Sequence, residues 1–150
     1  MLGSCAGRYG ERVRDEAVVR RDQFTRLVPV MAPEAVPPPQ RRWPDEQWAS
    51  VCRGHRARDM DDKWLAFVED DRLFLHRSWT GRGVYEAQFA RDGDGWFITE
   101  LIVSGDRGFY RRASDAYEAV FVEAIIDGVL LGRWDTDAWS RLRSMPREQP

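Results

Sequence analysis

The chain has 150 residues, of which 43% are hydrophobic and 12% aromatic, with seven tryptophans. This length fits one domain with its own core, and the aromatic content favours a packed domain over a disordered chain. The formal net charge of −2 at pH 7 gives no overall argument for a nucleic-acid or an anionic membrane partner.

Residues 1–42 differ in composition from the rest of the chain. The stretch 8–26 is rich in charge and weakly periodic, and Pro33 and the run Pro37-Pro38-Pro39 follow it. A proline run is extended and forms neither a helix nor a central strand. We therefore predict a flexible arm with a proline-rich linker over 1–42, a single domain over 43–144 and a tail over 145–150.

The first helix of the domain is expected directly after Trp43. Pro44 suits the first helical position, and Gly54 can end the helix. The apolar face between them carries Trp48, Val51 and Cys52. Cys52 and the distant Cys5 have no metal or redox spacing, so Cys52 is expected to be a free, buried thiol.

Four strands are expected next, over 63–69, 72–79, 83–90 and 96–103. Asp70-Asp71 would form the first turn, and Asp92-Gly93 is the strongest short hairpin signal of the chain. The segment 80–83 would connect the second strand to the third. Short connections of this kind predict an antiparallel meander.

A second helix is expected after Ser114, a favourable capping residue. Apolar residues recur at helical spacing from Tyr117 to Gly128, and Gly132 would end the helix. Trp134, Trp139 and Leu142 suggest a short terminal helix that folds back. The predicted fold class is α+β, with a four-stranded antiparallel β-meander packed against a long C-terminal helix and a short N-terminal helix.

Two-residue turns would fix the register of this sheet. Phe67 would then lie opposite Phe74, and His76 opposite Ala87. Directly opposed residues share a face, so one face would run from an apolar floor into a polar cluster of Lys63, His76, Ser78, Tyr85 and Glu100. The other face would pair Arg77 with the ring of Trp64 and with the carboxylate of Glu86.

Several polar residues of these strands have both a chemical and a structural interpretation. His76 could act as a general base or hold an anion, or it could be a strand histidine satisfied by a neighbour. Ser78 lies two residues further on, about 6–7 Å away at Cβ, and no nucleophile elbow surrounds it. Thr80 and Arg82, with two glycines, could cradle a phosphate, although a hairpin connection explains the same glycines.

An acidic cluster precedes the first strand and consists of Asp59, Asp61 and Asp62. Carboxylates of this kind bind hard cations, but the glycine and the terminal glutamate of a calcium loop are missing. No histidine–cysteine cluster supports zinc. We therefore expect a solvated acidic turn and no metal site.

Residues 55–103 resemble a small, uncharacterised bacterial family. The resemblance rests on Met60-Asp61-Asp62-Lys63-Trp64, on His76-Arg77-Ser78-Trp79-Thr80-Gly81, and on an aromatic residue at Tyr85. It covers about a third of the chain, and it implies a context of NAD or ADP-ribose metabolism. The resemblance establishes no catalytic residue to carry over to this chain, and it leaves the cofactor open.

The leading functional prediction is a non-catalytic binding module for an anionic, nucleotide-like ligand. Lys63, the only lysine of the chain, would neutralise phosphate together with Arg77 or Arg82. Aromatic stacking and directional hydrogen bonds would come from Trp64, Trp79, His76, Ser78, Thr80, Tyr85 and Glu100.

Two other functions stay open. One is a protein-interaction module of the immunity or adaptor type, with Trp43, Trp134, Trp139 and the N-terminal arm as its contact surface. The other is a hydrolase or transferase with His76 or Glu100 as base. No run approaches the ~18 apolar residues of a membrane helix, and a cytoplasmic location is expected.

Overall fold

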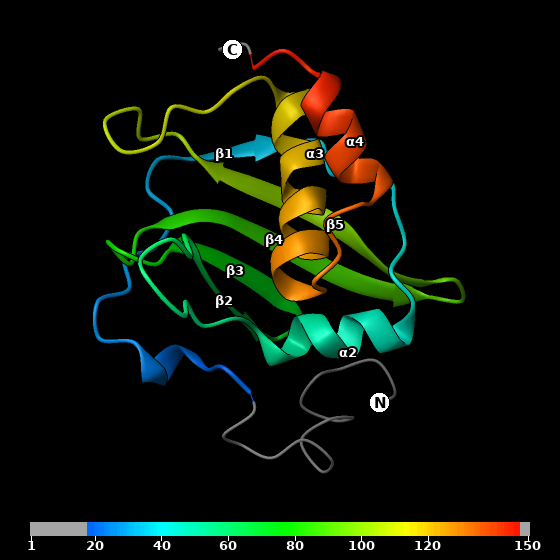
Figure 1. Ribbon diagram of the computed structural model, residues 1–150, viewed down its shortest axis with the longest axis horizontal. Coiled ribbons are helices and arrows are strands. Elements are labelled where there is room, and N and C mark those ends of the chain that lie inside the picture. Colours follow the sequence, from blue (N-terminus) through cyan, green and yellow to red (C-terminus); the bar gives the residue numbers. More distant parts are fainter. Residues whose placement is uncertain (1–17, 148–150) are drawn as a thin grey trace.

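The computed structural model describes residues 18–147, in which helices cover one face of an antiparallel sheet (Figure 1). The strand order is β1-β5-β4-β3-β2, with every neighbouring pair antiparallel. The strands are β1 (Pro33–Val36), β2 (Trp64–Glu69), β3 (Arg72–Arg77), β4 (Gly83–Asp92) and β5 (Gly95–Ser104). The α+β class and the meander from β2 to β5 are confirmed.

The prediction of four strands is wrong, because β1 adds a fifth strand beside β5. Pro33 lies opposite Ser104 and Val36 opposite Leu101. A proline is tolerated here because it begins a strand at the edge of the sheet. β1 lies within the stretch predicted as a linker, and residues 1–17 of that predicted arm lie outside the described residues. The boundary at Trp43 stays a prediction.

The face of the sheet opposite the helices is partly covered by residues that precede β1. The Arg21 guanidinium, in the short 3₁₀ helix η2 (Arg21–Gln23), binds the Glu69 carboxylate at 2.9 Å. The same guanidinium lies 4.8 Å from the ring centroid of Phe67 and 5.0 Å from that of Phe74. These contacts hold residues 21–23 against β2 and β3.

The turn between β2 and β3 agrees with its prediction. Asp70 and Asp71 have φ angles of 51° and 60°, as a two-residue turn of the favoured hairpin type requires. Phe67 lies opposite Phe74, as predicted. One face of this hairpin is therefore correctly placed.

The predicted register between β3 and β4 is wrong. Leu75 lies opposite Tyr85, and after a bulge His76 lies opposite Gly83 instead of Ala87. The connection from β3 to β4 is longer than the assumed two-residue turn, and an odd shift of register moves side chains to the other face. His76 and Tyr85 consequently lie on opposite faces of the sheet.

Two predicted pairings that involve β4 are also wrong. Tyr85 lies opposite Val103, whereas Glu100 lies opposite Gln88. The predicted pairing of Arg77 with Glu86 is absent among the described contacts, because Phe74 occupies the position opposite Glu86. The predicted polar cluster on one face does not form.

The predicted helices are present. α2 (Asp45–Arg53) ends at Gly54, whose φ of 73° favours glycine. α3 (Asp115–Ile125) begins after Ser114, whose Oγ accepts the backbone N–H of Tyr117 at 3.3 Å. It continues into a π-helical turn, η3 (Ile126–Leu130), and α4 (Asp137–Ser144) folds back beside α3 (Figure 1).

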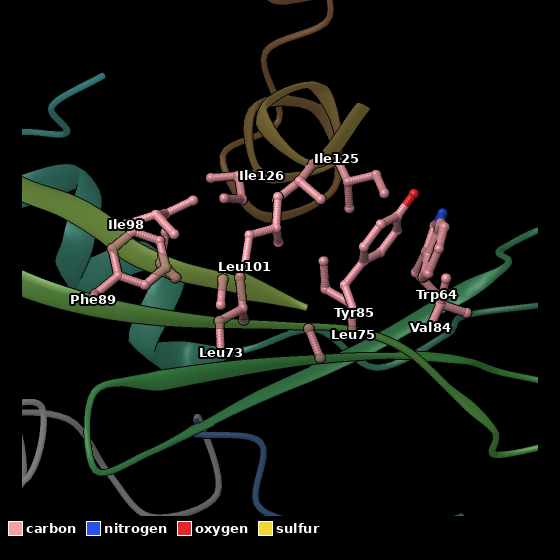
Figure 2. Packing of buried hydrophobic residues seen from close by; sticks show 14 of the residues in the cluster. Trp64, Leu73, Leu75, Val84, Tyr85, Phe89, Ile98, Leu101, Ile125 and Ile126 are labelled. Atoms are coloured by element: carbon pink, nitrogen blue, oxygen red, sulfur yellow. The ribbon is translucent and has the colours of Figure 1, made fainter. Parts of the chain in front are cut away.

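The main core lies between the sheet and α3. Figure 2 shows Ile125 and Ile126 above Leu73, Leu75 and Leu101, all of which are buried. On its other side, α3 packs Val120 and Ala124 against α4, through Ala138 and Leu142. The helix therefore buries two faces, which explains its long apolar stripe.

Two residues of the α2 region differ from their predictions. Trp43, expected at an exposed contact surface, is fully buried, and its backbone pairs with that of Trp96. Cys52 is buried as expected, but it is disulfide-bonded, so the prediction of a free thiol is wrong. Cys5 lies outside the described residues.

Candidate functional site

A pocket opens between the loop that precedes β2 and the C-terminal end of α3. Its volume of about 560 Å³ lies within the range of small-molecule sites. The loop contributes the polar side and the helical region the apolar side. The lining residues are His55, Arg58, Asp59, Asp61, Asp62, Lys63, Trp64, Phe121, Ile125, Gly128, Val129, Gly132, Trp134 and Trp139.

The loop over 55–63 is held by its own hydrogen bonds. The backbone N–H and C=O of His55 both pair with Ala66 of β2, each at 2.9 Å. His55 Nε2 lies 2.7 Å from Asp62 Oδ2, which also accepts the backbone N–H of Arg58 at 3.2 Å. Asp59 Oδ1 accepts two backbone N–H groups of the same turn. The polar side of the pocket is therefore ordered without a ligand.

Most of the acidic side chains of the loop thus have internal partners, whereas the two cations that line the pocket, Arg58 and Lys63, have none among the described residues. Within residues 18–147, no hydrogen bond or ion pair engages the side chain of Lys63 or that of Arg58. Asp61 likewise keeps its carboxylate for solvent, and its backbone N–H binds Asp59. Two cations are consequently free to meet a bound group.

The opposite side of the pocket is aromatic. The rings of Trp134 and Trp139 lie 5.1 Å apart, and the Trp134 side chain is 56% exposed. Trp134 packs directly on Gly128 of η3, where a Cβ would lie only 2.5 Å from a ring carbon. Glycine at this position therefore lets the indole close against the helix.

Ion pairs from two partly exposed arginines to buried carboxylates fix the helical turn behind this indole. The Arg41 guanidinium binds both oxygens of the fully buried Asp127, at 2.6 and 2.8 Å. Thr136 donates a further hydrogen bond to Asp127 at 2.7 Å. Arg141 of α4 binds the buried Glu123 at 3.0 Å. These contacts tie η3 to α4 and to the chain before α2. π-helical turns of this kind occur often at functional sites.

Of the predicted ligand-binding residues, only Lys63 and Trp64 line the pocket. Arg77 stacks over the Trp64 ring at 4.5 Å, as predicted. This contact gives Arg77 a structural role beside Trp64, and Arg77 itself does not line the pocket.

The side chains of His76 and Ser78 donate hydrogen bonds to backbone carbonyls. His76 is buried, and its Nδ1 donates a hydrogen bond to the Gly81 carbonyl at 2.8 Å. Burial lowers the pKa of His76 below its usual value. Ser78 Oγ donates to the Asp62 carbonyl at 2.7 Å. His76 therefore holds the connection between β3 and β4, and Ser78 ties that connection to the pocket loop.

The other predicted residues lie apart from the pocket. Thr80 Oγ1 accepts the Arg82 backbone N–H at 3.2 Å, and the Arg82 guanidinium stacks over Phe109 at 5.2 Å. Trp79 is exposed, and its Nε1 donates to the Met60 carbonyl at 3.0 Å. Glu100 pairs with Arg72 at 2.8 Å.

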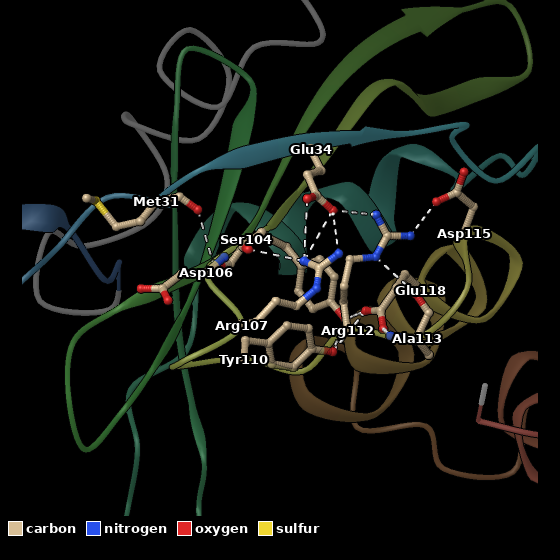
Figure 3. Close-up of polar contacts among 12 residues, drawn as sticks. Met31, Glu34, Ser104, Asp106, Arg107, Tyr110, Arg112, Ala113, Asp115 and Glu118 are labelled. Atoms are coloured by element: carbon tan, nitrogen blue, oxygen red, sulfur yellow. Dashed lines mark hydrogen bonds and ion pairs between the residues drawn. The ribbon is translucent and has the colours of Figure 1, made fainter. Parts of the chain in front are cut away.

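Tyr85 belongs to a buried cluster around Glu118 of α3. The Tyr85 and Tyr110 hydroxyls both donate to one carboxylate oxygen, Tyr110 at 2.9 Å, and the Ala113 N–H donates to the other at 2.7 Å. Figure 3 shows Tyr110, Ala113 and Glu118 together, beside the Arg112 network with Glu34. Burial raises the pKa of both tyrosines well above the usual value. The cluster fixes the start of α3.

The sequence interpretation missed His55, Trp134 and Trp139 as pocket residues. His55 lies in a loop without periodicity, although an aspartate seven residues further on is a signal that could have been weighed. The sequence predicts Trp134 and Trp139 as part of a contact surface, and nothing in the neighbouring sequence indicates that they lie beside Lys63. Trp139 is half-buried, and its Nε1 has no hydrogen-bond partner among the described residues.

Comparisons with known proteins do not assign the chain to a family. No protein family, no curated protein and no solved structure matches the chain. Over residues 18–147, no group of three or more histidine, cysteine or acidic side chains is arranged to hold a metal ion. In the same range, no helix is both long and apolar enough to cross a membrane. The resemblance to an uncharacterised bacterial family stays a prediction.

Proposed function

We propose that the protein is a binding module for a small anionic, nucleotide-like ligand, held in the pocket beside Lys63. The observation that carries the proposal is the free Lys63 ammonium at the rim of a pocket with indole rings on the far side. A lysine ammonium binds phosphate as a point charge, and an indole face stacks on a base. The ligand-binding set is therefore Lys63, Trp64, Arg58, Trp134 and Trp139.

The charge balance of the pocket favours a ligand with few negative charges. Three carboxylates and two cations line it. Asp62 and Asp59 already accept hydrogen bonds from the loop, so their charge is partly compensated. A triphosphate would still meet the Asp61 carboxylate, and like charges in close proximity repel. A monophosphate or an ADP-ribose-like ligand fits this balance better.

Isothermal titration with AMP and with ADP-ribose tests the proposal. At least one probe should bind to the unmodified protein, and Lys63→Ala should weaken binding about tenfold, or about 1.4 kcal/mol. Arg143→Ala is the matched control, because Arg143 is an exposed cation of α4 that does not line the pocket. Equal affinity in the Lys63 and Arg143 variants would contradict the proposal, as would the absence of millimolar binding of both probes.

A protein-interaction module is the second candidate, favoured by two exposed apolar side chains. Met60 is 72% exposed and Trp79 is 68% exposed, and the Trp79 indole N–H donates to the backbone carbonyl of Met60, so the two residues are adjacent. Contiguous exposed apolar patches often mark protein contacts. A partner detected by native mass spectrometry that is lost on Trp79→Ala but kept on Lys63→Ala would favour this function. The reverse pattern would favour the pocket.

A further inference from the structure

We propose that His55 and Asp62 form a general-base dyad, which hydrolyses an ester group of a molecule bound in the pocket. This activity goes beyond ligand binding, and it depends on neither the stacking indoles nor the identity of a nucleotide. The dyad lines the same pocket, with Lys63 beside it.

The hydrogen bond between the two side chains fixes which ring nitrogen is basic. His55 Nε2 lies 2.7 Å from Asp62 Oδ2. An ionised carboxylate only accepts, so Nε2 carries the proton, and a neutral ring then has its lone pair on Nδ1. No hydrogen bond to Nδ1 is present among residues 18–147. A base oriented by a carboxylate is one arrangement that supports general-base catalysis.

Both members of the dyad are held in place. The His55 backbone is bonded on both sides to Ala66 of β2, and Asp62 Oδ2 accepts a second bond from the Arg58 N–H. The Asp62 carbonyl also accepts the Ser78 hydroxyl at 2.7 Å. Catalytic groups act efficiently when the scaffold keeps them in one geometry.

The charged groups that line the pocket around His55 all come from its own loop. They are Arg58, Asp59, Asp61, Asp62 and Lys63. The helical side of the pocket contributes Phe121, Ile125, Gly128, Val129, Gly132, Trp134 and Trp139, none of which is titratable. Lys63 is therefore placed to stabilise negative charge that develops on a substrate oxygen.

The proposed step consumes one water molecule and one ester. His55 Nδ1 accepts a proton from the water as its oxygen bonds to the acyl carbon or the phosphorus of the ester. The bond to the leaving oxygen then breaks, and the imidazolium returns the proton to that oxygen. The products are an acid and an alcohol, and His55 ends neutral as it began.

Hydrolysis of p-nitrophenyl acetate and of p-nitrophenyl phosphate tests the step, and the two probes distinguish acyl from phosphoryl esters. With at least one probe, His55→Ala should lower the rate to that of buffer, and Asp62→Asn should lower it about tenfold. The chain has only two histidines, so His76→Gln is the control and should keep the rate. Free imidazole should restore activity to the His55→Ala protein beyond the rate of imidazole alone.

Two further measurements distinguish a general-base role of His55 from a purely structural pairing of His55 with Asp62. Water deprotonation predicts a slower reaction in D₂O, and thermal melting shows whether each variant is folded. Equal rates in the unmodified and His55→Ala proteins with both probes would overturn the proposal, and so would a rate without a D₂O effect or without imidazole rescue. Nucleotide binding that fails while His55-dependent hydrolysis persists would reject only the binding function.

Discussion

Glu118→Ala is expected to lower the free energy of unfolding by about 2–6 kcal/mol. The buried carboxylate accepts hydrogen bonds from two hydroxyls and one backbone N–H. The Tyr85 and Tyr110 hydroxyls lie 2.9 Å apart. In the variant, one of these hydroxyls can therefore donate a hydrogen bond to the other. One hydroxyl proton and the Ala113 N–H then remain without acceptors. Each buried unsatisfied group costs about 1–3 kcal/mol, which gives the total.

Urea unfolding, followed by tryptophan fluorescence and circular dichroism, measures this effect. Glu100→Ala is the matched control, because Glu100 is largely exposed and pairs with one arginine; such a pair contributes about 0–1 kcal/mol. Tyr85→Phe leaves Glu118 two donors and should cost about 1 kcal/mol. A loss in Glu118→Ala no larger than in Glu100→Ala would refute the reasoning.

Three further outcomes are expected. Gly128→Ala should displace the Trp134 ring, because the new Cβ would lie 2.5 Å from it; AMP binding should weaken in titration while the melting temperature changes little. Burial lowers the pKa of His76 below 6.5, so the unfolded chain takes up that proton first; urea midpoints should fall as pH drops below 6.5, and less so in His76→Gln. Arg41→Ala leaves buried Asp127 without its cation and should cost about 3 kcal/mol in the same assay.

The features that sequence predicted correctly depend on nearby residues. The turn at Asp70-Asp71 needs two residues that tolerate positive φ, and both are aspartates. The start of α3 needs a capping hydroxyl, and Ser114 supplies it. Gly54 ends α2 because it can adopt a φ that other residues avoid. The positions of this turn and of these helix ends can therefore be predicted from a few neighbouring residues.

The register failed because it depends on quantities that are not local. A strand alternates its faces with a period of two, so one miscounted turn residue reverses a whole strand. The connection from Ser78 to Arg82 is fixed by hydrogen bonds to distant residues, such as Val28 N–H to the Gly81 carbonyl at 2.9 Å. β1 was missed for a similar reason, because it is only four residues long and pairs with residues far along the chain.

The candidate site could be predicted only on one side. Lys63 and Trp64 stood out as a charged and an aromatic residue at the start of a strand, and both line the pocket. The other side comes from Trp134 and Trp139, about seventy residues later in the sequence. Their place depends on how α4 folds back on α3 and on the Arg41–Asp127 ion pair. No periodicity within either segment contains that information.

Residues Ser78 and Trp79, directly after β3, have a positional role, because they bind the loop that precedes β2. Ser78 donates its hydroxyl to Asp62 and its backbone N–H to the Lys63 carbonyl. Trp79 donates to Met60, so the segment after β3 is bonded to the loop before β2 at three points. A surface hairpin would not need these side chains for its own stability. Their effect is to fix the backbone on which Asp62 and Lys63 stand, and this is where both proposed activities are located.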